Sequence, residues 1–130
     1  MSTPLPRVEP VVIAGPAGAL EAVVEDPAPG SAPRAFLVVC HPHPLHGGTM
    51  TNKVVTTLAR TAHALGIPSL RFNFRGVGAS EGAFDEGRGE IEDALAVVAF
   101  GRQRWPDASL WLTGFSFGGV VALRASTTRG

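Results

Sequence analysis

The chain has 130 residues, 11 basic and 11 acidic side chains, and 45% hydrophobic residues. This composition fits one folded domain and excludes a chain disordered throughout, which requires low hydrophobicity and a high net charge. A formal net charge of zero provides no field that would attract nucleic acid or an anionic membrane. The single cysteine, Cys40, excludes an internal disulfide framework and, with no apolar signal segment in residues 1–10, leads us to expect a cytoplasmic protein.

Strand-forming segments dominate the first part of the chain. Residues 8–14 and 19–24 are rich in β-branched side chains, and the glycines and proline of residues 15–18 between them predict a hairpin turn. Residues 36–40 are apolar at every position, which is typical of a central strand covered on both faces. Residues 70–74 and 110–113 predict two further strands of this kind.

Helical periodicity fills the segments between the later strands. Apolar side chains recur every three or four residues over 54–65, and again over 91–98. Acidic residues crowd the N-terminal side of the second segment, where the helix dipole favours negative charge: Asp85, Glu86, Glu90, Glu92 and Asp93. A third helix is predicted after Ser116. The order β-β-β-α-β-α-β-α predicts one α/β domain over residues 1–130, with a mostly parallel sheet, an antiparallel N-terminal hairpin and helices on both faces.

The strongest chemical signal is the pentapeptide Gly114-Phe115-Ser116-Phe117-Gly118, directly after a predicted strand and before a predicted helix. A nucleophilic serine needs such a sharp strand-to-helix turn, which projects its hydroxyl away from the backbone. We expect Gly114, Gly118 and Gly119 to supply the space that this turn requires. The backbone N–H of Phe117, at the helix N-terminus, would then face a developing oxyanion. The alternative for the pentapeptide alone is an ordinary glycine-rich turn.

Two earlier segments extend this pattern. His41-Pro42-His43-Pro44-Leu45-His46-Gly47-Gly48 follows the strand at 36–40, and Arg75-Gly76-Val77-Gly78-Ala79-Ser80 follows the strand at 70–74. With the serine pentapeptide, they resemble the α/β-hydrolase superfamily, in particular small lidless serine hydrolases near the dienelactone-hydrolase and S33-peptidase-like groups.

The resemblance implies a serine hydrolase of ester, thioester or amide bonds that forms an acyl-enzyme on Ser116, needs no cofactor and takes a small-molecule acyl substrate. It also implies that the loop after the first central strand supplies the second oxyanion donor. Because Pro42 and Pro44 have no N–H, we expect that donor to be the backbone N–H of His43, with that of Leu45 as the alternative.

The histidine-rich loop has a competing interpretation. His41, His43 and His46 follow a spacing similar to a metallo-β-lactamase signature, which suggests a metal-dependent hydrolase, although Leu45 stands where that signature has an acid. The imidazoles could also serve only to pack the loop. A third alternative is a non-catalytic fragment.

A complete catalytic triad is not expected from these residues. The segment after Ser116 contains no Asp, Glu or His, whereas the resemblance places the acid and the histidine base after the serine. We therefore expect the N-terminal part of such a hydrolase, truncated after the serine turn and inactive or nearly so alone. The apolar strand at 110–113 would be left with an unpaired edge, so we also expect self-association through it.

Overall fold

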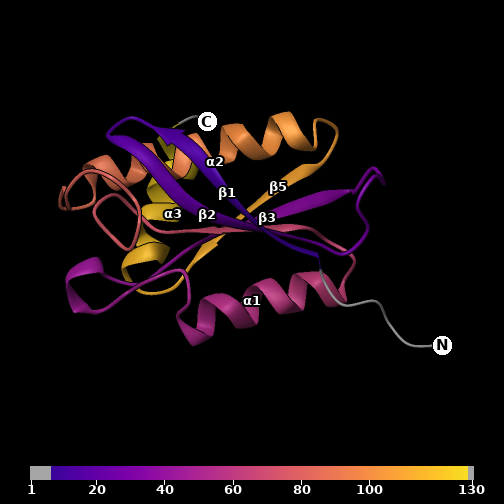
Figure 1. The fold of residues 1–130 in the computed structure, drawn as a ribbon, viewed down its shortest axis with the longest axis horizontal. Coiled ribbons are helices and arrows are strands. Elements are labelled where there is room, and N and C mark those ends of the chain that lie inside the picture. The colour runs from indigo at the N-terminus through magenta and orange to yellow at the C-terminus, as the bar shows by residue number, and fades with distance from the viewer. Residues whose placement is uncertain (1–6, 129–130) are drawn as a thin grey trace.

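The computed structural model describes residues 7–128 and contains one mixed five-stranded sheet flanked by helices (Figure 1). The strands are β1 (Arg7–Gly15), β2 (Gly18–Asp26), β3 (Ala35–Cys40), β4 (Ser69–Phe72) and β5 (Ser109–Gly114). The helices are the short 3₁₀ turn η1 (Pro44–His46) and the α-helices α1 (Lys53–Ala64), α2 (Arg88–Arg104) and α3 (Phe117–Thr128). This order confirms the predicted succession of strands and helices.

The sheet order is β1-β2-β4-β3-β5. β3 pairs in parallel with both β4 and β5, whereas β2 pairs antiparallel with both β1 and β4. Only β2 therefore runs against the other strands, which confirms the predicted mostly parallel sheet with an N-terminal hairpin. Every residue of β3 is buried, as its uninterrupted apolar sequence predicted.

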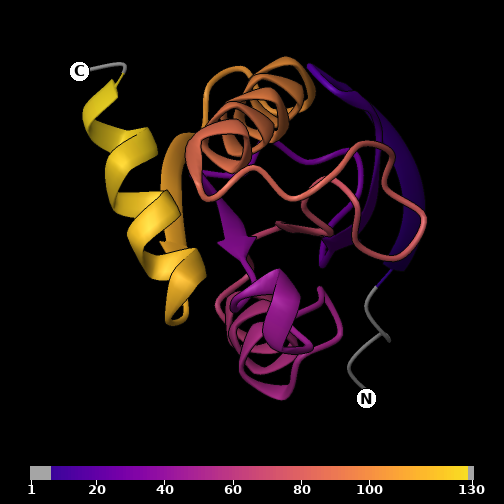
Figure 2. The same cartoon turned by 90° about the vertical axis from the view of Figure 1, so that its left-hand side faces the viewer.

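Alternation along β3 divides the core into two layers. Phe36, Val38 and Cys40 pack with residues of α2 and α3, whereas Leu37 and Val39 pack with α1 on the opposite face. Figure 2 shows this arrangement from the side, with α3 lying beyond β5 at one flank of the molecule. The helices therefore cover both faces of the sheet, as predicted.

β4 is shorter than the sequence suggested. We expected a strand over residues 70–74, but the strand ends at Phe72, and only one more backbone bond to β2 follows it. Asn73 N–H donates to the carbonyl of Glu21, and Phe74 N–H donates to the ring of His41. The chain therefore leaves the sheet at Asn73 and begins the loop that leads to α2.

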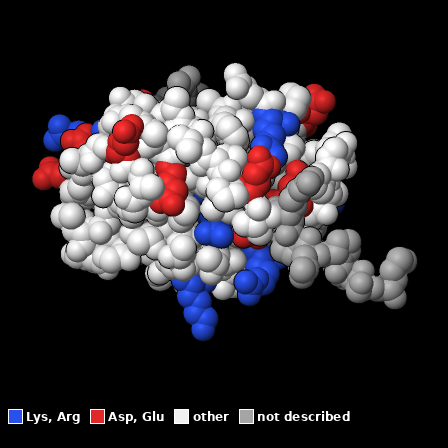
Figure 3. All heavy atoms as spheres, in the orientation of Figure 1, with Lys and Arg blue, Asp and Glu red and all other residues white. Residues whose placement is uncertain are grey.

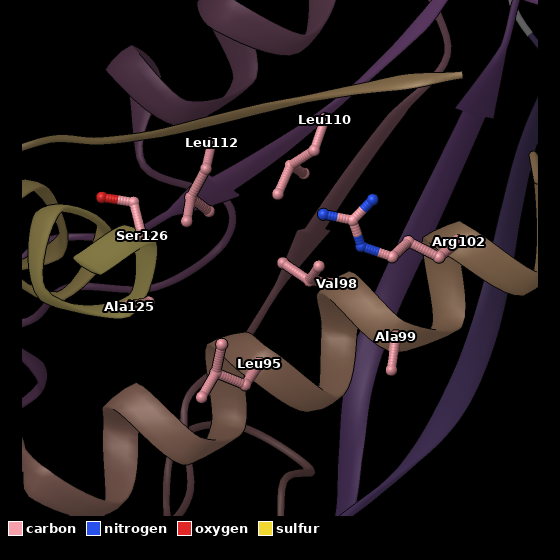
Figure 4. A pocket seen from close by; sticks show the side chains of 8 residues that line it. All are labelled: Leu95, Val98, Ala99, Arg102, Leu110, Leu112, Ala125 and Ser126. Atoms are coloured by element: carbon pink, nitrogen blue, oxygen red, sulfur yellow. The ribbon is translucent and has the colours of Figure 1, made fainter. Parts of the chain in front are cut away.

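The flank formed by β5 and α3 is apolar. Among the described residues β5 pairs only with β3, and the large exposed side chains here are Trp111, Phe115, Val120 and Leu123. A groove of about 360 Å³ runs between α2, β5 and α3, lined by Leu95, Val98, Ala99, Arg102, Leu110, Leu112, Ala125 and Ser126 (Figure 4).

The charged side chains form no single-sign patch on the face seen in Figure 3, where acidic and basic groups are interspersed. Within residues 7–128, no helix has both the length and the hydropathy needed to cross a membrane.

Candidate active site

Ser116 occupies the sharp turn between β5 and α3. β5 ends at Gly114 and α3 begins at Phe117, so only two residues connect the strand to the helix. Ser116 adopts a φ of 59°, the left-handed region that side-chain-bearing residues rarely enter. Its side chain is exposed. Strained backbone of this kind persists where the surrounding structure imposes it, and it is concentrated at functional sites.

Two glycines allow this turn to pack. A Cβ on Gly114 would overlap the carbonyl of Gly118, and a Cβ on Gly118 would overlap the carbonyl oxygens of Cys40 and His41. Gly119 differs from the expectation, because a Cβ there would meet Gly114 O at 3.4 Å, an ordinary contact. The close packing of the turn therefore requires Gly114 and Gly118 but not Gly119.

The histidine-rich loop lies against this turn. The parallel register pairs Cys40 with Gly114, and Phe115 N–H donates to Cys40 O at 3.3 Å. The ring of His43 lies 4.8 Å from the ring of Phe117. Within residues 7–128, neither the backbone N–H of His43 nor that of Phe117 donates to a protein acceptor. Two backbone donors, one from each loop, thus have no protein acceptor in this part of the chain.

His41 has a structural position inside the core. Its side chain is fully buried, its Nδ1 lies 2.7 Å from Pro42 O, and its Nε2 accepts the N–H of Phe74 at 3.1 Å. These partners fit the neutral ring with the proton on Nδ1. Burial is the main cause that lowers the pKa of His41, with the bond to Pro42 acting in the opposite direction. His41 therefore fastens the loop to the end of β4.

The three-histidine metal site does not form. Both ring nitrogens of His41 are engaged, and His43 Nδ1 accepts the N–H of Leu45 at 3.1 Å. Among the described residues, no three His, Cys, Asp or Glu side chains converge to hold a metal ion. Burial raises the pKa of the Cys40 thiol to about 12, so the thiol is protonated in the metal-free chain. The metal-dependent alternative therefore finds no cluster of ligands within residues 7–128.

Aromatic rings surround the two loops. His43 stacks on His46 with ring centroids 4.4 Å apart, and Phe84 lies 5.1 Å from His43 and 6.0 Å from Phe117. Phe84 comes from the loop between β4 and α2, which the sequence did not connect to the site. Three loops, each following a strand, thus meet around the serine turn.

Two acidic residues of α2 have a different role from the one expected. From the sequence we expected Asp93 and Glu90 to interact with the helix dipole near the N-terminus of the helix, but both are fully buried. Asp93 pairs with the guanidinium of Arg75, and Glu90 accepts two backbone N–H groups of the preceding loop. The signal that could have revealed Glu90 is its place three residues after the helix cap Gly87, the position of a capping-box carboxylate.

Among residues 7–128, no histidine is hydrogen-bonded to the serine as a general base would be. Within the part of the chain that the structure describes, no hydrogen bond joins the Ser116 hydroxyl to a histidine ring, and no Asp, Glu or His follows Ser116 in the sequence. The chain therefore brings together a serine and candidate oxyanion donors without an acid–base pair.

Comparison with known proteins finds the same fold. A family profile described as serine aminopeptidase, S33, matches residues 31–130. An alpha-beta serine hydrolase homologue from Coxiella burnetii shares 45% identity and a TM-score of 0.87, over 93% of this chain and 58% of that one. XC6422 from Xanthomonas campestris, an a/b serine hydrolase without lid, shares 45% identity and a TM-score of 0.88, over 94% and 56%.

A curated relative matches over a similar span. The uncharacterized protein RP471 of Rickettsia prowazekii (strain Madrid E) is 43% identical over 111 residues, which is 85% of this chain and 46% of that protein. The chain thus spans about half the length of the relatives it matches.

Proposed function

The chain belongs to the serine aminopeptidase S33 family of α/β hydrolases, and on this basis we propose that Ser116 is the nucleophile of a serine hydrolase. The substrates would be small molecules with an ester, thioester or amide bond. The observation that carries the proposal is the φ of 59° at an exposed serine between strand and helix, because strained residues of this kind are concentrated at active sites.

The proposed step is nucleophilic acyl transfer. The Ser116 Oγ attacks the carbonyl carbon, the hydroxyl proton passes to a base, and the electron pair of the carbonyl moves onto its oxygen. When the carbonyl re-forms, the bond to the alcohol, thiol or amine breaks and that group leaves with a proton. Water then cleaves the acyl-enzyme by the same sequence, which regenerates Ser116.

The backbone N–H groups of Phe117 and His43 are proposed to bind the negative oxygen. Both lack a protein acceptor among the described residues, and the packing of Gly118 against Cys40 and His41 fixes one loop against the other. Preorganised donors of this kind stabilise the transition state because they need not reorient during the reaction. Loss of one costs roughly a hundred- to a thousandfold in rate.

The acid and the base of the reaction are not assigned to residues of this chain. Its histidines are His41, which is buried and bonded on both ring nitrogens, His43 and His46 on the oxyanion side, and His63 on α1. A base must lie on the leaving-group side, so none of these meets the requirement. Because the chain spans about half the length of its relatives, turnover by the whole protein is part of the proposal.

A fluorophosphonate probe tests the nucleophile directly. We expect covalent labelling, located by peptide mass spectrometry at Ser116, and no labelling of Ser116→Ala. Ser126→Ala is the matched control, because Ser126 is also an exposed serine of this part of the chain, on α3. Labelling that persists in Ser116→Ala, or that maps to another serine, would refute the assignment.

A further inference from the structure

The loop between β4 and α2 is held near its start by an ion pair of Arg75 with the buried Asp93. Arg75 follows β4 closely, and its guanidinium contacts Asp93 of α2 at 2.9 Å and 3.1 Å while also donating to Gly89 O at 2.9 Å. The backbone N–H of Arg75 donates to the same carboxylate at 3.0 Å. Charge-assisted bonds of this bidentate type fix orientation as well as position.

A second buried carboxylate holds the last turn of the same loop. Glu90 is fully buried, and its two oxygens accept the N–H of Asp85 at 2.8 Å and of Gly87 at 2.9 Å. Between these donors, Glu86 adopts a φ of 55°. A left-handed glutamate is strained, so the carboxylate maintains a conformation that the loop would not adopt alone.

This turn places Phe84 beside the ring of Phe117, the residue after the serine. The ring of Phe84 lies 5.1 Å from that of His43 and 6.0 Å from that of Phe117, the two residues whose N–H groups form the proposed oxyanion hole. Phe84, His43 and Phe117 are each half-buried, and Phe117 directly follows Ser116 in the chain.

We propose that Phe84, held in place by Glu90, forms an aromatic wall of the acyl-binding site and selects uncharged, flat acyl groups such as arylacetyl. This inference rests on the proposed nucleophile. The physical reason is that aromatic rings pack favourably edge-to-face or offset on one another, and that a charged acyl group would lose its hydration against apolar rings. Phe84 would determine specificity by contact, and Glu90 would act as a positioning residue.

The test compares acylation by two activated esters, p-nitrophenyl phenylacetate and p-nitrophenyl acetate. In each, the Ser116 Oγ forms a bond to the acyl carbon, the ester bond to p-nitrophenolate breaks, and the hydroxyl proton passes to solvent. Single-turnover release of p-nitrophenolate gives both rates. We expect the chain to prefer phenylacetyl, and Phe84→Ala to lower the phenylacetyl-to-acetyl ratio by about two- to tenfold, the range of one aromatic contact. Phe84→Leu, which keeps an apolar side chain, should lower the ratio less.

Two further variants separate contact from general loosening. Glu90→Gln keeps the side-chain volume but presents one acceptor to the two N–H groups, so it should lower the ratio in the same direction. Phe100→Ala is the matched control, because Phe100 is also a half-buried phenylalanine but lies toward the far end of α2. Equal losses for both esters in Phe84→Ala, or an unchanged ratio in Glu90→Gln, would overturn the proposal.

A binding measurement distinguishes this inference from the proposed nucleophile. In Ser116→Ala, the neutral analogue phenylacetamide should shift the NMR amide signals of Phe84 and Phe117, whereas acetamide should not. Binding without any acylation in the unmodified chain would refute the nucleophile and retain the aromatic wall. Acylation at Ser116 with no preference and no such shifts would retain the nucleophile and refute the wall.

Discussion

Replacing Gly118 with alanine tests whether the contact between the serine turn and the histidine-rich loop controls the site. The added Cβ would lie closer than 3.0 Å to the carbonyl oxygens of Cys40 and His41, a distance that real Cβ atoms essentially never show. The two carbonyl oxygens belong to the backbone and the new Cβ is bonded directly to it, so no side-chain rotation relieves the overlap. Restoring a contact of about 3.5 Å requires α3 and the loop to separate by roughly 1 Å.

The expected consequences follow from that separation. A misplacement of about 1 Å can lower a reaction rate about a hundredfold, so fluorophosphonate labelling of Ser116 should slow by about that factor. Overpacking should also lower the free energy of unfolding by about 1–3 kcal/mol, partly offset by the gain of about 0.5–1 kcal/mol when alanine replaces glycine in a helix.

The adjacent glycine provides the control. In Gly119→Ala the new Cβ would meet Gly114 O at 3.4 Å, so we expect unchanged labelling and equal or higher thermal stability. Labelling rates and thermal unfolding, measured for both variants, test whether the effect is specific to Gly118. Wild-type labelling in Gly118→Ala, or equal losses in both variants, would refute the reasoning.

Three other predictions concern stability and association. Arg75→Met should lower the free energy of unfolding by about 3 kcal/mol, because it leaves the buried Asp93 carboxylate unpaired. Urea denaturation would measure this loss, with Arg102→Met, which replaces an exposed arginine, as the control. Burial lowers the pKa of His41, so the unfolded chain binds the proton more readily than the folded chain does. The free energy of unfolding should therefore be greatest above the ordinary histidine pKa of about 6.5 and should fall as the pH drops below it. Thermal unfolding at several pH values should show a weaker pH dependence in His41→Gln. The apolar edge of β5 should drive self-association that light scattering detects and that Trp111→Lys, at an exposed position of β5, reduces; a monomer at all concentrations would contradict this.

The sequence predicted what local patterns determine. Uninterrupted apolar residues identified β3, and glycine spacing identified the turn at Ser116, because both depend on neighbouring residues. Periodicity could not reveal the pair of Arg75 and Asp93, which are distant in the sequence and meet only when α2 packs over the end of β4. The sequence analysis related Asp93 and Glu90 only to the helix dipole, which favours acidic residues near a helix N-terminus.

Gly89 offered an overlooked signal for that buried pair. Glycine is unfavourable inside a helix, so its presence in the first turn of α2 needs a reason. A Cβ at this position would overlap the guanidinium of Arg75, so the absence of a side chain at Gly89 leaves the room that the guanidinium occupies. The end of β4 was also unpredictable from sequence, because Phe74 looks like a strand residue and leaves the sheet only because its N–H bonds to His41.

The register between β3 and β5 links all these features to the proposed chemistry. Cys40 pairs with Gly114, so the loops that follow them begin at the same level of the sheet although they are distant in sequence. A shift of one residue would move one loop by about 3.3 Å relative to the other and turn every β5 side chain to the opposite face. It would bury Trp111 beneath α2 and α3 and expose Leu110 and Leu112, and it would carry the N–H of His43 beyond hydrogen-bond reach of an oxyanion at Ser116. The apolar pattern that fixes the core therefore also fixes the distance between the nucleophile and its proposed oxyanion hole.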